Sequence, residues 1–253
     1  MTSPDQPRLR LFAGPNGSGK STVVEVLTRS QLGVYVNADD LERAWKRTGS
    51  YDLARYQLGE EQAKRWWPSL QASPLMNAAR LQALEGAIKV EGTTLFVDPG
   101  KVNSYLPAAT TDFIRQELLE LRMTFTFESV MSHASKVELL RKAQASGYRT
   151  YLYFIATDDP AINVARVKQR VELDGHPVCE EKIRKRYYES IALLEDAVAA
   201  TNRAYIFDNS GDRHVWLAEI TDGEELTLHS DELPQWFTTS SLWQAFQGDA
   251  ASS

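Results

Sequence analysis

Short apolar runs alternate along this chain with longer segments in which apolar residues recur at helical spacing. The short runs are rich in β-branched and aromatic residues, which is typical of buried strands. They lie at residues 9–13, 34–36, 124–129, 148–156 and 204–207. Helical patterns follow them at residues 21–30, at 135–145, from 160 onward and at 180–199. Strands that alternate with helices predict an α/β fold with a doubly wound, mainly parallel sheet and helices on both faces.

Two parts of the chain depart from this alternation. Between about residues 45 and 122 the pattern predicts a mostly helical insertion. Its expected elements are helices at 60–70, 76–84 and 106–121, breaks at Pro68 and Pro74, and a strand-like stretch at 87–97. Near the other end, two apolar runs flank Asp222-Gly223, which predicts a C-terminal β-hairpin.

The loop after the first strand has the composition of a phosphate cradle. Gly14-Pro15-Asn16-Gly17-Ser18-Gly19-Lys20-Ser21 matches the full G-x-x-x-x-G-K-[ST] pattern, and Thr22 follows it. Glycines let successive N–H groups point inward toward phosphates. Lys20 is expected to reach the β- and γ-phosphates, and the Ser21 hydroxyl to bind Mg²⁺. A nucleotide site over residues 14–22 is therefore the prediction, and a glycine-rich surface turn is the alternative.

Composition narrows the possible partners. The chain has 253 residues and a formal net charge of −6, so a main role in holding nucleic acid is not expected. Cys179 is the single cysteine, which rules out an intramolecular disulfide and suits a reducing compartment. The longest apolar run, residues 151–156, is too short to span a bilayer. We expect a cytoplasmic protein without a membrane partner.

Carboxylates at strand ends are candidates for orienting or deprotonating an acceptor hydroxyl. Asp39 and Asp40 follow the second strand and Glu128 ends a later one, so both positions belong to the ligand edge of an open α/β sheet. Phosphoryl transfer needs a carboxylate that orients or deprotonates the acceptor, and Asp39 is the expected base. The alternatives are that Asp39 or Asp40 caps the helix expected from Leu41, and that Glu128 caps a helix or pairs with a lysine.

Arginines supply the positive charge that such a transfer needs. Arg166 and Arg170 share one helical face just before Gly175, where a lid could bring both guanidinium groups to the migrating phosphoryl group. The alternative is an ion pair with Glu172 or Asp174. The aromatic residues of the insertion, by contrast, are expected in its core. They are Tyr51, Tyr56, Trp66 and Trp67.

These motifs follow one another as in zeta-toxin-like P-loop kinases, which the chain resembles over most of residues 8–211. The resemblance implies an enzyme that uses ATP or GTP with Mg²⁺ to phosphorylate a hydroxyl of a small molecule. A nucleotide sugar such as UDP-N-acetylglucosamine is the implied acceptor, and a separately encoded antitoxin is the implied partner. The matching segments are Gly14–Thr22, Val36–Asp40, Phe127–Ser129, Ser132-His133, Gly147-Tyr148, Arg166 with Arg170, residues 175–178, Arg186-Tyr187 and Asp208–Ser210.

The resemblance also implies roles for single residues. Lys20 would hold the γ-phosphate, Asp39 would be the base, and Arg166 with Arg170 would be lid arginines. Substrate contacts are implied at Asp39, Glu128, Ser129 and His133. The family carries Glu-Gly-Thr at its acceptor motif, whereas the strand here ends Glu128-Ser129-Val130 and a literal Glu91-Gly92-Thr93 lies upstream. We assign the motif to Glu128 because a helix and then a strand follow it, as a sheet crossover requires.

The expected organisation is a P-loop kinase domain over residues 1–211, a hairpin extension over 212–237 and a flexible tail over 238–253. Two other functions stay open. One is a nucleoside, nucleotide or RNA-end kinase, which shares the loop and the base. The other is a nucleotide-hydrolysing regulatory module, which a lid-like arginine pair disfavours.

Overall fold

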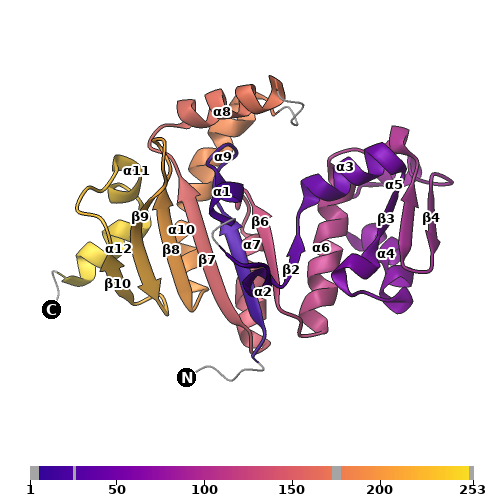
Figure 1. Ribbon diagram of the computed structural model, residues 1–253, viewed down its shortest axis with the longest axis horizontal. Helices are drawn as coiled ribbons and strands as arrows, with labels where there is room; N and C mark the ends of the chain where they lie inside the picture. Colours follow the sequence, from indigo (N-terminus) through magenta and orange to yellow (C-terminus); the bar gives the residue numbers. More distant parts are fainter. Residues whose placement is uncertain (1–5, 25–26, 173–177, 251–253) are drawn as a thin grey trace. The chain divides into compact units, whose positions relative to one another are not determined.

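The computed structural model describes residues 6–24, 27–172 and 178–250, and the chain forms two compact units (Figure 1). The first unit consists of residues 1–33 and 126–253. The second consists of residues 34–125, so the chain leaves the first unit once and returns to it once.

A mainly parallel sheet forms the centre of the first unit, with strand order β10-β9-β8-β7-β1-β6. The pairs β1–β7 and β7–β8 are parallel, whereas β8–β9 and β9–β10 are antiparallel. The predicted α/β sheet is therefore confirmed. The strands are β1 (Arg8–Ala13), β6 (Phe125–Ser129), β7 (Arg149–Ala156), β8 (Arg203–Asp208), β9 (Val215–Thr221) and β10 (Glu225–Leu228).

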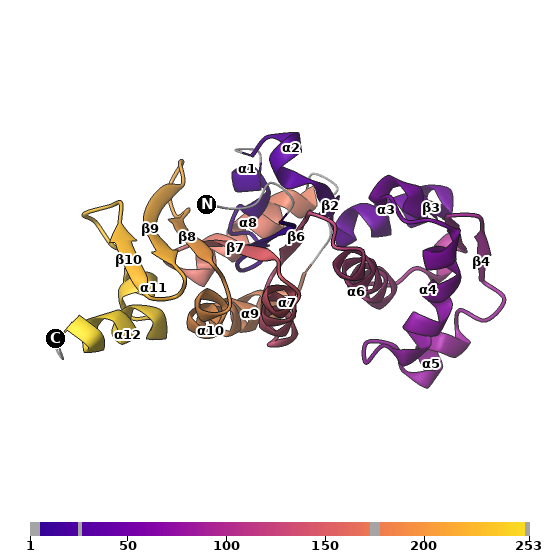
Figure 2. The ribbon, with the colours of Figure 1, turned by 90° about the horizontal axis from the view of Figure 1, so that it is seen from below.

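Helices cover one face of this sheet almost completely. The side chains there are aliphatic or aromatic and fully buried, among them Leu11, Leu152, Phe154 and Ile206. Figure 2 shows the covering helices together on that side. They are α7 (Ser135–Ala145), α9 (Glu180–Ala192), α10 (Leu194–Ala199), α11 (Gln235–Thr238) and α12 (Ser241–Ala250). On the other side lie α1 (Lys20–Val24) and α2 (Arg29–Leu32), near β1 (Figure 2).

Three expected elements differ from the structure. The single helix expected over 21–30 is two short helices, because Thr28 starts α2 with a capping box in which its side chain accepts from the backbone N–H of Gln31. Val26, counted in that helix, lies outside the described residues. The helix expected over 180–199 is divided at Leu193 into α9 and α10. Residues 241–250, expected to be a flexible tail, form α12, in which Leu242 is only 2% exposed.

The predicted C-terminal hairpin is present. β9 and β10 pair in antiparallel fashion, with Thr221 opposite Glu225. Asp222 and Gly223 in the turn both adopt positive φ, 51° and 78°, which Asp and Gly tolerate better than other residues. The division of the chain into a kinase domain over residues 1–211 and an extension from residue 212 stays a prediction.

The second unit has its own small sheet and its own core. Trp45 and Trp66 are fully buried with ring centroids 5.9 Å apart, and Tyr51 and Tyr56 are also buried, as predicted. A three-stranded antiparallel sheet has the order β3-β5-β4. The elements are β2 (Val34–Val36), α3 (Ala38–Thr48), β3 (Ser50–Asp52), α4 (Glu60–Ala72), α5 (Ala78–Gln82), β4 (Ile88–Glu91), β5 (Thr94–Val97) and α6 (Tyr105–Glu120), with 3₁₀ turns at Leu53–Tyr56 and Pro99–Lys101.

The helix break predicted at Pro68 is wrong, because α4 continues through this proline to Ala72. Pro68 is exposed, so water can bond the carbonyl oxygen that loses its intrahelical partner.

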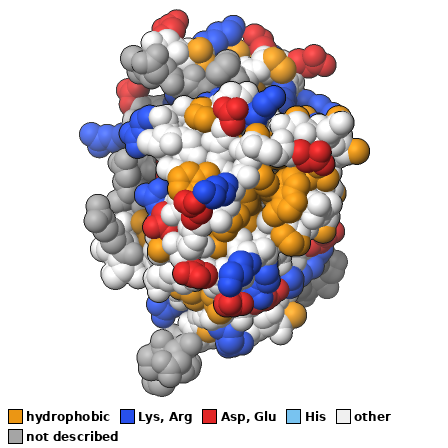
Figure 3. Space-filling model, turned by 90° about the vertical axis from the view of Figure 1, so that its right-hand side faces the viewer, with side chains coloured by type: hydrophobic (Ala, Val, Ile, Leu, Met, Phe, Trp, Pro, Cys, Tyr) orange, Lys and Arg blue, Asp and Glu red, His pale blue; other side chains and the backbone are white. Residues whose placement is uncertain are grey.

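Seen from the right-hand side of Figure 1, side chains of both charges are scattered among hydrophobic ones (Figure 3). Among the described residues, no helix is both long enough and apolar enough to cross a bilayer.

Candidate functional site

The loop between β1 and α1 has a backbone that only glycine can supply. Gly14, Gly17 and Gly19 have φ values of 140°, 77° and 88°. A Cβ on Gly14 would lie 1.9 Å from the backbone oxygen of Ile155, and one on Gly17 would lie 2.6 Å from that of Asn163. Atoms cannot approach so closely, so the curl of the loop requires glycine for space as well as for φ. This is the geometry expected of a phosphate cradle.

Lys20 begins α1 and turns back over the loop. Its Nζ donates hydrogen bonds to the backbone oxygens of Gly14 and Pro15, each at 2.9 Å. The ammonium group therefore lies at the loop, as the motif predicts, with neutral carbonyl oxygens as partners. Thr22, which follows the motif, donates from its hydroxyl to the backbone oxygen of Gly19 at 2.8 Å. It therefore helps to fix the first turn of α1.

Ser21 and Glu128 come together although they are distant in the sequence. The Ser21 hydroxyl lies 3.3 Å from both carboxylate oxygens of Glu128 at the end of β6. Hydroxyl and carboxylate oxygens are the ligands that Mg²⁺ prefers, and this ion usually takes one or two protein groups with phosphates and waters. The donor set fits Mg²⁺. Glu128, predicted as an acceptor contact, therefore lies beside the residue predicted as the metal ligand.

Two asparagines to which the sequence assigned no role hold the loop from outside. Asn209, directly after β8, donates from Nδ2 to the backbone oxygen of Ser18 at 2.8 Å. Asn163 donates from Nδ2 to the backbone oxygen of Asn16 at 2.7 Å, and its Oδ1 accepts from the Thr157 hydroxyl. Asn163 lies in α8 (Pro160–Glu172) and is fully buried. The one sequence signal was the place of Asn209 at a strand end.

Arg166 and Arg170 are brought to different environments. Arg166 donates from Nη1 to the backbone oxygen of Asn209 at 2.6 Å and from Nη2 to that of Gly211 at 3.1 Å. It thus holds the loop that follows β8, and within the described part of the chain it forms no ion pair with Glu172. Asp174, the other predicted partner, lies outside the described residues. Arg170 is exposed near the end of α8. Residues 173–177, where the lid turn was expected, lie outside the described residues.

The same loop is also held from the C-terminal part of the chain. Trp236 in α11 donates from Nε1 to a carboxylate oxygen of Asp208 at 2.8 Å, and from its backbone N–H to Asp158 at 3.3 Å. The other oxygen of Asp208 accepts from the backbone N–H of Ser210 at 2.9 Å. Burial raises the pKa of Tyr187, whose neutral hydroxyl donates to the backbone oxygen of Thr157 at 2.6 Å.

Asp39 and Asp40 lie in the second unit, in the first turn of α3. The N-cap of this helix is Asn37, whose Oδ1 accepts from the backbone N–H of Asp39 at 2.9 Å. Helix α3 therefore begins before Leu41, and neither aspartate is its cap. Asp40 pairs with Arg43 at 3.0 Å, whereas Asp39 is exposed. The capping alternative for this acidic pair is excluded.

The other residues expected near the acceptor are bonded locally. The Ser129 hydroxyl accepts from the backbone N–H of Met131 at 3.0 Å, and His133 Nδ1 accepts from that of Ser135 at 3.2 Å, at the start of α7. Glu91-Gly92-Thr93 forms the turn between β4 and β5 in the second unit, with a φ of 56° at Gly92. This literal Glu-Gly-Thr is a hairpin turn, whereas Glu128 ends a strand of the central sheet.

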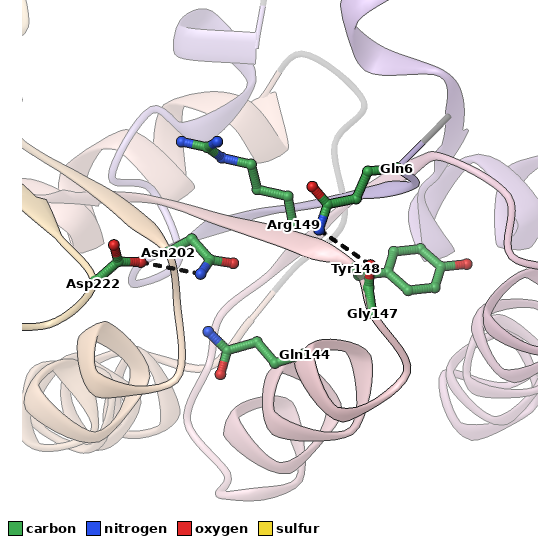
Figure 4. A pocket seen from close by; sticks show the side chains of 7 residues that line it. All are labelled: Gln6, Gln144, Gly147, Tyr148, Arg149, Asn202 and Asp222. Carbon is green, nitrogen blue, oxygen red and sulfur yellow. Dashed lines mark hydrogen bonds between the residues drawn. The ribbon is translucent and has the colours of Figure 1, made fainter. Parts of the chain in front are cut away.

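A pocket of about 360 Å³ lies at the opposite end of the central sheet (Figure 4). Two side-chain amides of the pocket lining donate hydrogen bonds to neighbouring residues. Gln6 donates to the backbone oxygen of Gly147 at 3.3 Å, and Asn202 donates to Asp222 at 3.0 Å. It lies at the amino ends of β7 and β8, away from the phosphate loop. The lining residues are Gln6, Gln144, Gly147, Tyr148, Arg149, Asn202 and Asp222.

A family model described as Zeta toxin matches residues 108–221. This part of the chain is zeta-toxin-like. The matched part includes Glu128, Arg166 and Arg170, and it begins after the phosphate loop. The loop itself therefore rests on its own sequence pattern and geometry, independently of the zeta-toxin match.

Two solved structures are similar to this chain. The native AvrRxo1-ORF1:-ORF2 complex has a chain that matches with a TM-score of 0.50 and 15% identity, over 94% of this chain and 65% of that one. A structure of the PezAT chromosomal toxin-antitoxin system of Streptococcus pneumoniae matches with a TM-score of 0.49 and 14% identity, over 100% and 88%. At such identities the likeness concerns the fold alone.

One curated protein matches a shorter part of this chain. An uncharacterised protein of Haemophilus influenzae is 33% identical over 63 residues, which are 25% of this chain and 45% of that protein. This chain thus spans less than half of the Haemophilus influenzae protein and less than two thirds of the AvrRxo1-ORF1:-ORF2 chain.

Proposed function

We propose that the protein is a P-loop phosphotransferase that moves the γ-phosphate of ATP or GTP to an alcohol group of a small molecule. The observation that carries the proposal is the loop over residues 14–21, whose glycines leave no room for a Cβ and whose Lys20 lies over its backbone. The pairing of Ser21 with Glu128 adds the oxygen ligands that such a reaction needs. The zeta-toxin likeness favours a kinase over a regulatory module.

Each residue of the site has a defined task in this reaction. Backbone N–H groups of the loop bind phosphate oxygens, and Lys20 exchanges its carbonyl partners for phosphate oxygens. Ser21 and Glu128 would hold Mg²⁺, which when bound offsets the negative charge of the phosphates. Asp39 accepts the proton of the acceptor hydroxyl at a carboxylate oxygen. Asn163 and Asn209 keep the loop curled throughout.

The zeta-toxin likeness favours a nucleotide sugar such as UDP-N-acetylglucosamine as the acceptor. It also favours a role as the toxin of a pair, restrained by a separately encoded antitoxin. Arg166 and Arg170 would stabilise the transferring phosphoryl group. For Arg166 this requires that its guanidinium leave the carbonyl oxygens of Asn209 and Gly211, to which it is bonded here.

Product analysis tests the reaction directly. The protein is incubated with ATP labelled on its γ-phosphate and with separate pools of nucleotide sugars, nucleosides and RNA 5′ ends, and products are identified by mass. The expected product is a nucleotide sugar that has gained one phosphoryl group. Label released only as inorganic phosphate would make the protein a nucleotide hydrolase, and label on RNA would make it an end kinase. Lys20→Ala serves as the inactive control.

The place of Glu128 can be tested separately. Glu128→Gln removes a charged oxygen ligand, so the Mg²⁺ concentration for half-maximal activity should rise about tenfold. The matched control is Glu138→Gln, which changes an exposed glutamate of α7. An unchanged Mg²⁺ requirement together with a raised KM for the acceptor would place Glu128 at the acceptor instead.

A further inference from the structure

One face of the central sheet carries no helix over β8, β9 and β10 within the described part of the chain. Figures 1 and 2 agree on this: α7, α9, α10, α11 and α12 lie on the opposite side, whereas α1 and α2 lie near β1 and α8 lies near α1. The pairs β8–β9 and β9–β10 are antiparallel, and an antiparallel part of a sheet can leave one face to water when that face carries polar side chains. The side chains on this open face are indeed largely charged or aromatic.

Arginines and aromatic residues stand side by side on the open face, which we call the arginine–tyrosine face. The strand register places Arg10 opposite Tyr151 and Tyr151 opposite Arg203. It also places Tyr205 opposite Glu219 on β9. The face consists of Arg149, Tyr151 and Tyr153 on β7, Arg203, Tyr205 and Phe207 on β8, and Trp216 and Glu219 on β9. On the same side of the sheet, Arg8, Arg10 and Phe12 of β1 lie next to it, and of these Arg10 and Phe12 are buried.

The aromatic rings of this face stack on one another across the strands. Phe12 and Tyr153 have centroids 4.5 Å apart with an interplanar angle of 7°, and Tyr153 and Tyr205 are 4.9 Å apart at 22°. At the far side, Trp216 stacks on His229 with centroids 3.5 Å apart. Much of the ring surface is thus already used within the protein. Nucleic-acid bases, which bind sheet faces by stacking on free rings, have little to stack on here.

Positive charge on this face is incompletely paired. Arg10 Nη1, Arg149 Nε and Arg203 Nε are buried and have no hydrogen-bond partner. Burial also lowers the pKa of Arg10, as expected for a desolvated guanidinium. Of the residues that form the face, Glu219 alone is acidic, and it is ion-paired with Arg203. A surface with an excess of arginines thus lies on a chain whose formal net charge is −6.

We propose that the arginine–tyrosine face docks an acidic segment of a partner protein. Carboxylates satisfy guanidinium donors better than any neutral group and would complement the excess positive charge. Tyr, Trp and Arg are the residue types that dominate the binding energy of protein interfaces. Trp216 is 37% exposed at the rim of the face, where it can anchor such a segment.

The test selects binders from a library of random peptides displayed against the full chain. Selected peptides are synthesised, and their affinities are measured by fluorescence anisotropy for the wild type, Arg149→Glu, Arg203→Glu and the control Arg141→Glu. Arg141 lies on α7, on the covered side of the sheet, and is ion-paired with Asp196 at 3.2 Å, so it matches Arg203 in chemistry but not in place. Oligothymidylate is tested as a competitor.

The expected peptides are enriched in Asp and Glu, and each reversal on the face weakens them at least about tenfold while Arg141→Glu does not. Replacing the Asp and Glu residues of a peptide by Asn and Gln should weaken its binding to the wild-type protein by a similar factor. This measurement needs no protein variant, so it remains valid even if a variant fails to fold. Peptides without an acidic excess, or equal losses in face and control variants, would overturn the proposal. Displacement of the peptides by oligothymidylate would assign the face to nucleic acid.

Discussion

Asn209 contacts the phosphate loop at Gly19 closely enough for the coupling of the two residues to be measured. A Cβ on Gly19 would lie 2.1 Å from Nδ2 of Asn209, the atom that donates to the backbone oxygen of Ser18. Gly19→Ala therefore has two costs. The alanine must adopt a φ of 88°, which costs about 1–2 kcal/mol. It must also displace the amide, which leaves the carbonyl of a buried residue unsatisfied at a cost of about 1–2 kcal/mol.

These costs predict a non-additive pair. Gly19→Ala should lower the free energy of unfolding by about 2–4 kcal/mol and Asn209→Ala by about 1–2 kcal/mol. In the double variant the amide is already absent, so the lost hydrogen bond is counted once. The double variant should therefore be more stable than the sum of the single variants implies, by about 1–2 kcal/mol.

Urea unfolding of the wild type, both single variants and the double variant measures the coupling. Gly86→Ala is the matched control, because Gly86 has a φ of 73° but no heavy atom within 4 Å of its added Cβ. It should cost about 1–2 kcal/mol and add to Asn209→Ala without coupling. If Gly19→Ala and Asn209→Ala are also additive, the contact between loop and amide does not restrict Gly19, and the reasoning fails.

Three further substitutions test single residues. Lys20→Ala should abolish phosphoryl transfer and leave the circular dichroism spectrum unchanged, because glycine backbone and not this side chain shapes the loop; retained turnover would refute its role. Asp39→Asn should still bind nucleotide in a fluorescence titration but lose transfer by about 10²-fold, with Asp40→Asn as the mild control; an active Asp39→Asn would exclude this base. Arg166→Ala should lower the free energy of unfolding by about 1–3 kcal/mol, since it removes charged hydrogen bonds to backbone oxygens, whereas Arg170→Ala should lower it less because Arg170 is exposed.

The sequence was sufficient for the phosphate loop because the motif is local. The spacing of its glycines, Lys20 and Ser21 within one short segment fixes the backbone and the charge together, and the structure has the expected strand before it and helix after it. The alternation of strands and helices was likewise visible as a pattern of apolar residues. The register of the strands across the sheet could not be predicted from this pattern, because strand pairing joins segments that are distant in the chain.

The contacts that hold the loop could not be predicted in this way. Asn163 and Asn16 are 147 positions apart, and Asn209 and Ser18 are 191 apart. No local sequence pattern distinguishes an asparagine that bonds to the phosphate loop from any other asparagine, since asparagines of either kind occur after strands and in helices. Arg166 shows the same limit: its spacing from Arg170 indicates a shared face but says nothing of the carbonyl oxygens that it meets.

Trp236 lies beyond the residues that the zeta-toxin model matches, yet it contacts the end of β8. The matched region ends at residue 221, yet the indole of Trp236 donates to Asp208, next to the asparagine that holds the phosphate loop. A chain shortened to the matched boundary would leave the carboxylate of Asp208, which is only 9% exposed, without that donor. The contacts that stabilise this protein therefore extend beyond residues 108–221, the part that the zeta-toxin model matches. An expression clone designed from the family boundary would discard part of the scaffold on which the nucleotide loop depends.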